Sequence, residues 1–106
     1  MKEITVKEMM ERIGNEVVDV ESLDVYGVSV NMRKASIEYD DDAAVKLLTF
    51  AYGDRINGGM SVSYEVDGCI ERVTYDEEDD CYIVEFNEYM TDIHITPIRE
   101  IIRRIK

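Results

Sequence analysis

The sequence has little of what disulfides, metal sites and membrane spans require. It holds two cysteines, one histidine, one proline and no tryptophan in 106 residues. Cys69 and Cys81 have no C-x-x-C partner, and one histidine leaves a structural zinc site short of ligands within a protomer. We therefore expect two free thiols and no bound metal. No apolar run approaches the roughly 18 residues of a membrane helix.

The first residues lack the apolar segment of a signal peptide, which predicts a cytoplasmic protein without membrane contact. Motifs of common catalytic sites are also missing: there is no G-x-S-x-G, Walker loop, G-x-G-x-x-G or H-E-x-x-H. Asp92 and His94 could form an acid/base pair, but two such residues on one strand more simply share a solvated face. We expect no enzyme and no cofactor.

One acidic segment has part of the alternation of a calcium-binding loop. It reads Asp76-x-Glu78-x-Asp80, but Cys81 stands where the loop requires glycine, and Asn87 stands where it requires a bidentate glutamate. The segment is therefore not an EF-hand. Only weak, non-specific binding of divalent cations is expected from its adjacent carboxylates.

Negative charge is what the sequence has in excess. It carries 24 acidic and 12 basic residues, a net charge of -12. Residues 60–92 contain eleven acids against Arg72 alone, whereas the last eight residues are net positive. A field of one sign repels nucleic acid and membranes, and attracts basic surfaces. The sequence predicts a basic protein partner and no direct DNA binding, with solubility as the alternative reason for the acidity.

The candidate partner-binding residues are two acidic runs and a neighbouring tyrosine. Tyr75 and Tyr82 also flank the second run. Tyrosine rings beside carboxylates suit arginine-rich surfaces, with ordinary sheet packing as the alternative. The set comprises Asp40, Asp41, Asp42, Asp76, Glu77, Glu78, Asp79, Asp80 and Tyr39.

The length predicts a single domain over residues 1–106. A first helix is expected over 6–13, because Thr5 and Glu8 form a capping box and apolar residues follow at helical spacing. A second is expected over 43–52, where acids precede an apolar segment and Gly53 follows it.

A third helix is expected over 97–105, opened by Thr96 and Pro97. Its basic end suits the helix dipole, and helix stabilisation is enough to explain it. The alternative, that this end contacts an acidic patch of a partner or RNA, stays open. Between the first two helices, the apolar residues of 26–32 and those of 35–39 have opposite parity. A strand there requires a turn or a bulge at Arg33-Lys34.

Residues 60–87 predict a three-stranded meander. Asp67-Gly68 forms the first turn and 77–80 the second, and this register sets Val73 opposite Val84 and Tyr75 opposite Tyr82. A short strand over 93–95 follows. The whole sequence predicts an α+β fold, an antiparallel sheet with two or three helices packed on one face.

The same register places Glu71 on the apolar face, near Tyr64 and Phe86. A lone buried carboxylate is costly. Glu71 is therefore expected at the sheet end in water, or paired with a tyrosine hydroxyl or an arginine; the alternative is that it lines a small pocket.

The opening 5–13, followed by acidic strands, resembles small accessory proteins of phages and mobile elements. Some similar acidic proteins are anti-CRISPR or anti-restriction inhibitors that mimic nucleic acid. The resemblance implies a non-enzymatic inhibitor that occupies the basic nucleic-acid-binding surface of a host defence nuclease or similar enzyme. No functional residue is carried over from it.

Two other functions fit the same charge pattern. One is an immunity protein or antitoxin that neutralises a basic toxin. The other is a small phage structural or housekeeping module whose acidity serves only solubility. The sequence leaves the oligomeric state and the identity of the partner open.

Overall fold

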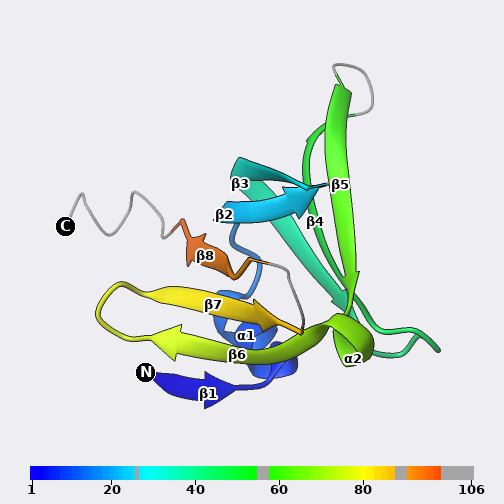
Figure 1. Cartoon of the computed structure of the whole chain (residues 1–106). Helices are drawn as coiled ribbons and strands as arrows, with labels where there is room; N and C mark the ends of the chain where they lie inside the picture. The colour runs from blue at the N-terminus through cyan, green and yellow to red at the C-terminus, as the bar shows by residue number, and fades with distance from the viewer. Residues whose placement is uncertain (26, 55–57, 88–90, 99–106) are drawn as a thin grey trace.

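The computed structural model describes residues 1–25, 27–54, 58–87 and 91–98, which form an all-β fold (Figure 1). One antiparallel sheet of eight strands has the order β1-β6-β7-β8-β2-β3-β4-β5 within these ranges. The expected α+β fold is wrong, because most of the apolar residues lie on strands. The elements are β1 (Lys2–Ile4), α1 (Val6–Ile13), β2 (Val18–Val25), β3 (Val28–Asp40), β4 (Leu47–Asp54), β5 (Gly58–Glu65), α2 (Val66–Cys69), β6 (Ile70–Asp76), β7 (Cys81–Phe86) and β8 (Ile93–Pro97).

The helix expected over 6–13 is confirmed as α1. The Glu8 backbone N–H donates to Thr5 Oγ1 at 3.0 Å, and the Thr5 N–H donates to Glu8 Oε1 at 3.4 Å, which completes the capping box. Met9 and Ile13 are buried on the face that α1 turns to the core. Gly14 follows with φ of 67°, a conformation that glycine adopts at little cost.

The helix expected over 43–52 is wrong. Residues 47–54 form β4. Leu48 and Phe50 are fully buried in this strand, whereas Leu47, its first residue, is exposed. Burial alternates along β4, as it does in a strand with one face on the core. The segment is a strand because hydrogen bonding to β3 and β5 on both of its edges outweighs the local helix signals. The third helix, expected over 97–105, does not begin at Pro97, because Pro97 is the last residue of strand β8. The rest of the expected helix, from residue 99 on, lies outside the described residues.

Strand β3 is shared between two halves of the sheet. Its residues 28–35 pair with β2, and its residues 36–40 pair with β4. The change of parity predicted at Arg33-Lys34 is a bulge, because Val18 pairs with Ala35 but Val20 pairs with Met32. Lys34 has φ of 55° there. The bulge lies where β3 passes from one neighbour to the other, and bulges bend strands at such points.

The predicted meander is half correct. Strands β6 and β7 pair in the predicted register, with Val73 opposite Val84 and Tyr75 opposite Tyr82. The first turn is wrong: residues 66–69 form α2, and β5 and β6 are not neighbours in the sheet. Helix α2 instead carries the chain from one end of the sheet towards the other, and Figure 1 shows it at the corner between β5 and β6.

One cluster of buried side chains lies between the two halves of the sheet and α1. Tyr82, Phe50 and Leu23 are among its largest fully buried members. The rings of Tyr64 and Phe86 lie 4.9 Å apart and join the β5 end to the β7 end. The strand expected at 93–95 is confirmed within β8, which contributes Ile93 and Ile95 to this core. Within the described ranges, no helix has the length and hydropathy to cross a membrane.

Candidate acidic interaction surface

The acidic run 76–80 forms the turn between β6 and β7, and local hydrogen bonds fix its shape. The Glu78 N–H donates to Asp76 Oδ1 at 3.1 Å, which closes an Asx turn. Asp80 has φ of 49°, and its Oδ1 accepts the Tyr75 hydroxyl at 2.9 Å. Glu77, Glu78 and Asp79 are exposed between these two anchors. Two of the five carboxylates therefore hold the turn, and three face the solvent.

The tyrosines beside this turn pack within the protein. The Tyr75 and Tyr82 rings lie 4.8 Å apart, and Tyr82 is fully buried. The guanidinium of Arg12 lies 5.1 Å from the Tyr75 ring centre, within range of a cation–π contact. The Tyr75 ring therefore contacts an arginine of the same chain, Arg12. The ring face that was expected to receive a partner's arginine is occupied by this contact.

The acidic run 40–42 lies at the end of β3. Asp40 Oδ1 accepts the N–H of Asp42 at 3.1 Å and that of Ala43 at 3.2 Å. This carboxylate begins the turn towards β4, where the sequence signals had indicated a helix start. Asp41 and Asp42 are exposed, and Tyr39 is half-buried against the core.

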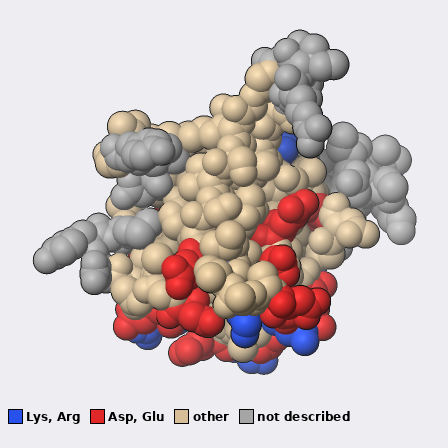
Figure 2. Space-filling model, turned by 90° about the vertical axis from the view of Figure 1, so that its right-hand side faces the viewer, with Lys and Arg blue, Asp and Glu red and all other residues tan. Residues whose placement is uncertain are grey.

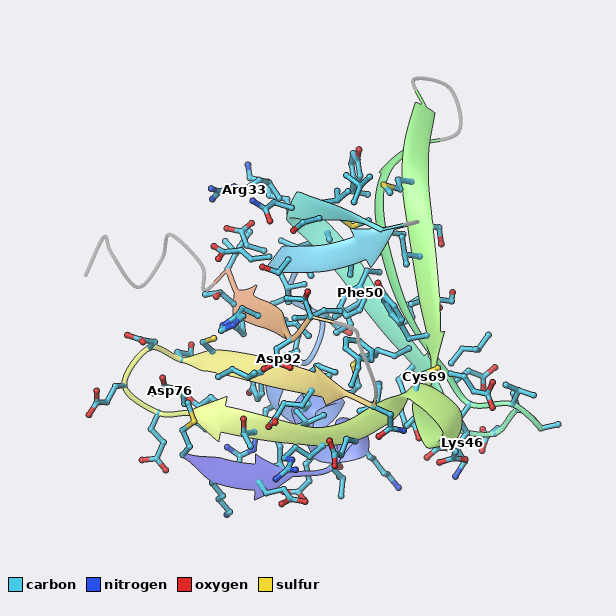
Figure 3. All side chains as sticks on the ribbon, in the orientation of Figure 1. Arg33, Lys46, Phe50, Cys69, Asp76 and Asp92 are labelled. Atoms are coloured by element: carbon cyan, nitrogen blue, oxygen red, sulfur yellow. The ribbon has the colours of Figure 1, made fainter. Side chains whose placement is uncertain are left out.

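The structure does not bring the two acidic runs together. In Figure 1 the β6–β7 turn lies at the left of the molecule, and the β3–β4 connection lies at the lower right. Figure 3 shows the same separation between the labelled Asp76 and Lys46, the residue just before β4. The candidate residues therefore form two surfaces, which we name the β6–β7 turn (76–80) and the β3–β4 loop (40–42).

On one face of the molecule, the acidic side chains lie mainly over the lower half (Figure 2). Figure 2 shows them over the lower half of one face, with some basic side chains among them at the bottom, while the upper part carries no acidic side chain in this view. The upper part is the arm formed by β4 and β5. Its residues 47–53 and 58–64 are uncharged, and the charged residues of its two strands, Asp54 and Glu65, stand at strand ends. On this face, the acidic side chains therefore lie away from the β4–β5 arm (Figure 2).

Glu71 is exposed and does not lie on the apolar face. A register shift between Ile70 and Arg72 moves it outwards, and Ile70 takes the position opposite Phe86. Its Oε1 lies 3.5 Å from Arg72 Nη2, and Arg72 Nε lies 3.5 Å from Glu85 Oε2. The pairing with an arginine that the sequence allowed is therefore present. Glu71 also lines a shallow depression of about 300 Å³ between β1 and β6.

The two cysteines are free thiols. Cys81 is buried, and this burial raises the pKa of its thiol, with smaller contributions from the carboxylates of Asp76 and Asp79. A raised pKa makes a thiol less reactive, which does not suit a nucleophile. Among the described residues, no three histidine, cysteine or acidic side chains are placed to hold a metal ion.

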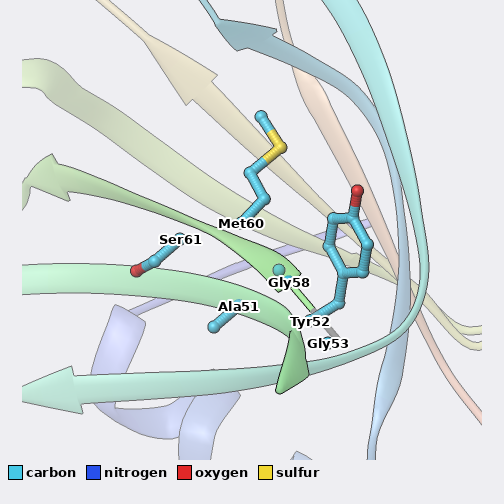
Figure 4. Close-up of a pocket in the computed structure, with 7 residues that line it drawn as sticks. Ala51, Tyr52, Gly53, Gly58, Met60 and Ser61 are labelled. Carbon is cyan, nitrogen blue, oxygen red and sulfur yellow. The ribbon is translucent and has the colours of Figure 1, made fainter. Parts of the chain in front are cut away.

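Sequence reasoning missed a surface depression at the outer end of the arm. It is an open depression of about 600 Å³ rather than an enclosed cavity, and backbone and uncharged side chains of β4 and β5 line it, among them Tyr52, Met60 and Ser61 (Figure 4). Gly53 and Gly59, which line it, are partners in the β4–β5 ladder and lie so close that a Cβ atom on either would lie 2.4 Å from a backbone oxygen. The sequence signal that could have indicated it is the group of glycines at 53, 58 and 59.

Comparisons with protein-family models, with curated proteins and with solved structures find no match to this chain.

Proposed function

We propose that this protein is a non-enzymatic inhibitor that binds the basic, nucleic-acid-binding surface of a host defence nuclease or similar enzyme in the cytoplasm of a bacterial cell. The observation that carries the proposal is the β6–β7 turn. Glu77, Glu78 and Asp79 project from a two-stranded ribbon whose turn is held on both sides. A fixed row of carboxylates is what a mimic of a phosphate backbone requires, since duplex DNA carries one charge per about 1.7 Å.

The charge of this turn is available to a partner. Within the described residues, no ion pair joins Glu77, Glu78 or Asp79 to a basic side chain; the three ion pairs found there involve Arg33 and Arg72 only. Solvated carboxylates of this kind lose counterions and water when a basic surface meets them, so binding is steered by charge and weakened by salt.

Rigidity supports the same proposal. The Tyr75 hydroxyl bond to Asp80 and the packing of the Tyr75 ring between Arg12 and Tyr82 order the base of the turn before any partner arrives. A preformed surface loses little conformational entropy on binding, and more of its interaction energy is kept as affinity.

The experiment measures binding to an immobilised panel of CRISPR effectors and restriction endonucleases at about 50 and about 300 mM NaCl. We expect one member to bind, the complex to dissociate at the higher salt, and its own nucleic acid to compete. If no member binds, or if bound protein is indifferent to both salt and nucleic acid, the proposal is wrong.

Two variants of equal charge locate the interface. Glu77→Gln with Glu78→Gln neutralises the β6–β7 turn, and Asp41→Asn with Asp42→Asn neutralises the β3–β4 loop. Both spare the carboxylates that hold each turn, Asp76 and Asp40, so the fold is retained. We expect the first pair to weaken binding about tenfold or more, at about 1.4 kcal/mol per tenfold, and the second pair to change it less.

A further inference from the structure

The two edges of the sheet are very different. The β1 edge has three residues, of which Lys2 and Glu3 are charged and exposed. The β5 edge has eight residues, and its sequence Gly58–Glu65 holds no proline and no charge before Glu65. Natural proteins protect exposed edges with short strands, charges, proline or bulges. Strand β1 has two of these protections, because it is short and charged. Strand β5 is long, pairs with β4 without a bulge, and has only one charge, at its last residue, Glu65.

No described strand pairs with the outer side of β5, which ends the order of the sheet. Alternate backbone N–H and C=O groups of an edge strand point away from its one neighbour and can accept another strand. The β5 edge is therefore a surface to which an extended strand can add.

The charge distribution indicates which strand this is. A net charge of -12 makes two copies of the chain repel each other over most of their surfaces. The β4–β5 arm carries little charge, because residues 47–53 and 58–64 are uncharged and the strands hold charged residues only at their ends, Asp54 and Glu65. An uncharged patch on a strongly acidic protein is where a second acidic copy can approach at the smallest electrostatic cost.

We propose that β5 pairs with β5 of a second copy, antiparallel and about a two-fold axis, which joins two eight-stranded sheets into one continuous sheet. The proposal concerns a different surface from the β6–β7 turn and does not depend on the proposed inhibition. A two-fold interface uses the same patch on both subunits, so β5 must complement itself.

A pairing centred on Val62 meets that condition. Val62 then faces its own copy, Met60 faces Tyr64 and Ser61 faces Ser63. Each pair joins residues of one parity, as antiparallel strands require, since directly opposed residues lie on the same face. The apolar set Met60, Val62 and Tyr64 already packs on the core, and the pairing extends that apolar face across the axis. The two Glu65 side chains lie at opposite ends, so no like charges meet.

Exposed apolar area at the arm supports the same pairing. Tyr52, which stands opposite Met60 in the β4–β5 register, is 44% exposed and lines the open depression of about 600 Å³ next to the β5 edge. A second arm laid against this edge would cover part of that surface. Burial of apolar area then adds to the backbone hydrogen bonds that the pairing forms.

Sedimentation equilibrium of the whole chain tests the proposal, from about 5 to about 500 µM and at low and about 0.5 M NaCl. We expect a monomer–dimer equilibrium that strengthens with salt, because salt screens the repulsion between two acidic copies. Binding to a basic partner weakens with salt, so the two proposals can fail separately. A monomer at every concentration and salt overturns the pairing and leaves the β5 edge for a strand of another protein.

Matched variants place the interface. Ser61→Glu adds a charge to the β5 edge and should weaken association at least tenfold, whereas Asn15→Glu adds the same charge on an exposed loop and should not. Dimers that tolerate Ser61→Glu form elsewhere, and the proposal is then wrong.

Cross-linking tests the register itself. Residues opposed across the axis have Cβ atoms about 5 Å apart, close enough for a disulfide after small adjustments. Val62→Cys should give disulfide-linked dimers on mild oxidation, while Leu47→Cys, on the exposed start of β4, and the unaltered chain should not. Equal cross-linking of the two variants would contradict pairing about Val62.

Discussion

The Asp19 carboxylate on β2 accepts the backbone N–H of Lys34 on β3 at 3.1 Å, at the bulge where β3 leaves β2 for β4. The bulge frees an N–H from the ladder of backbone hydrogen bonds, and the carboxylate satisfies it. The other oxygen of Asp19 lies 3.3 Å from the Arg33 guanidinium. One aspartate thus holds both residues of the bulge.

The backbone bond should matter more than the ion pair. Asp19→Ala leaves the Lys34 N–H unpaired and should lower the free energy of unfolding by about 1–2 kcal/mol. Arg33→Ala removes only an exposed ion pair, since the Arg33 side chain is 81% exposed, and should change it by less than about 0.5 kcal/mol. Urea denaturation of both variants measures the difference; equal losses would mean that the ion pair is the contact that counts.

The bulge also constrains the side chain at position 34. Lys34 has φ of 55°, where a β-branched residue is strained and glycine is not. Lys34→Val should be less stable than Lys34→Gly by about 1–2 kcal/mol. The lysine side chain is exposed, so its loss is common to both variants. Thermal unfolding compares them, and a more stable valine variant would show that the strand is regular here.

The Tyr75 hydroxyl should stabilise the β6–β7 turn. Tyr75→Phe keeps the ring between Arg12 and Tyr82 but removes the hydrogen bond to Asp80, and should cost about 0.5–1.5 kcal/mol. Hydrogen exchange at residues 77–79 should become faster. An unchanged exchange rate would mean that the Asx turn of Asp76 orders the segment without Tyr75.

The two thiols should differ in reactivity. Burial raises the pKa of Cys81 above its ordinary value of 9.0, while Cys69 is only half-buried. At pH 8 iodoacetamide should therefore modify Cys69 first, as mass spectrometry of the intact chain would show. Faster modification of Cys81 would contradict its burial.

The same shift predicts a pH dependence of stability. The unfolded chain loses the Cys81 proton near pH 9.0, whereas the folded chain holds it to higher pH. Stability from this group is present below pH 9 and falls as the pH rises through the folded pKa, because the unfolded state binds fewer protons there. Cys81→Ala should flatten the loss between about pH 8 and about pH 10, with tyrosine ionisation common to both proteins.

Adjacent leucines test the strand that replaced the expected helix. Leu48 is fully buried and Leu47 is 38% exposed. Leu48→Ala should lower the free energy of unfolding by about 2–5 kcal/mol, and Leu47→Ala by less than about 1 kcal/mol. Comparable losses at both positions would not fit burial with a period of two.

Local chemistry determined the features that the sequence predicted correctly. The capping box of Thr5 and Glu8 starts α1, and the parity change at Arg33-Lys34 becomes a bulge. Alternation on both sides of 77–80 sets the β6–β7 register. Each is decided by residues within a few positions of one another. The excess of acids and their density in 60–92 are likewise properties of the sequence alone.

Only the tertiary structure decided the features that depend on distant partners. Residues 43–52 have acids before them and Gly53 after them, signals that suit a helix. Residues 47–54 instead form a strand, because β3 and β5 hydrogen-bond to both of its edges. Asp67-Gly68 lies in α2, because β6 pairs with β1 and β7 and leaves β5 at the far edge. The sequence determined how much charge the protein carries and which segments carry it. The fold separated those segments onto two ends and left a long edge strand, β5, that is uncharged up to Glu65, because strand order depends on which pairings bury the common core.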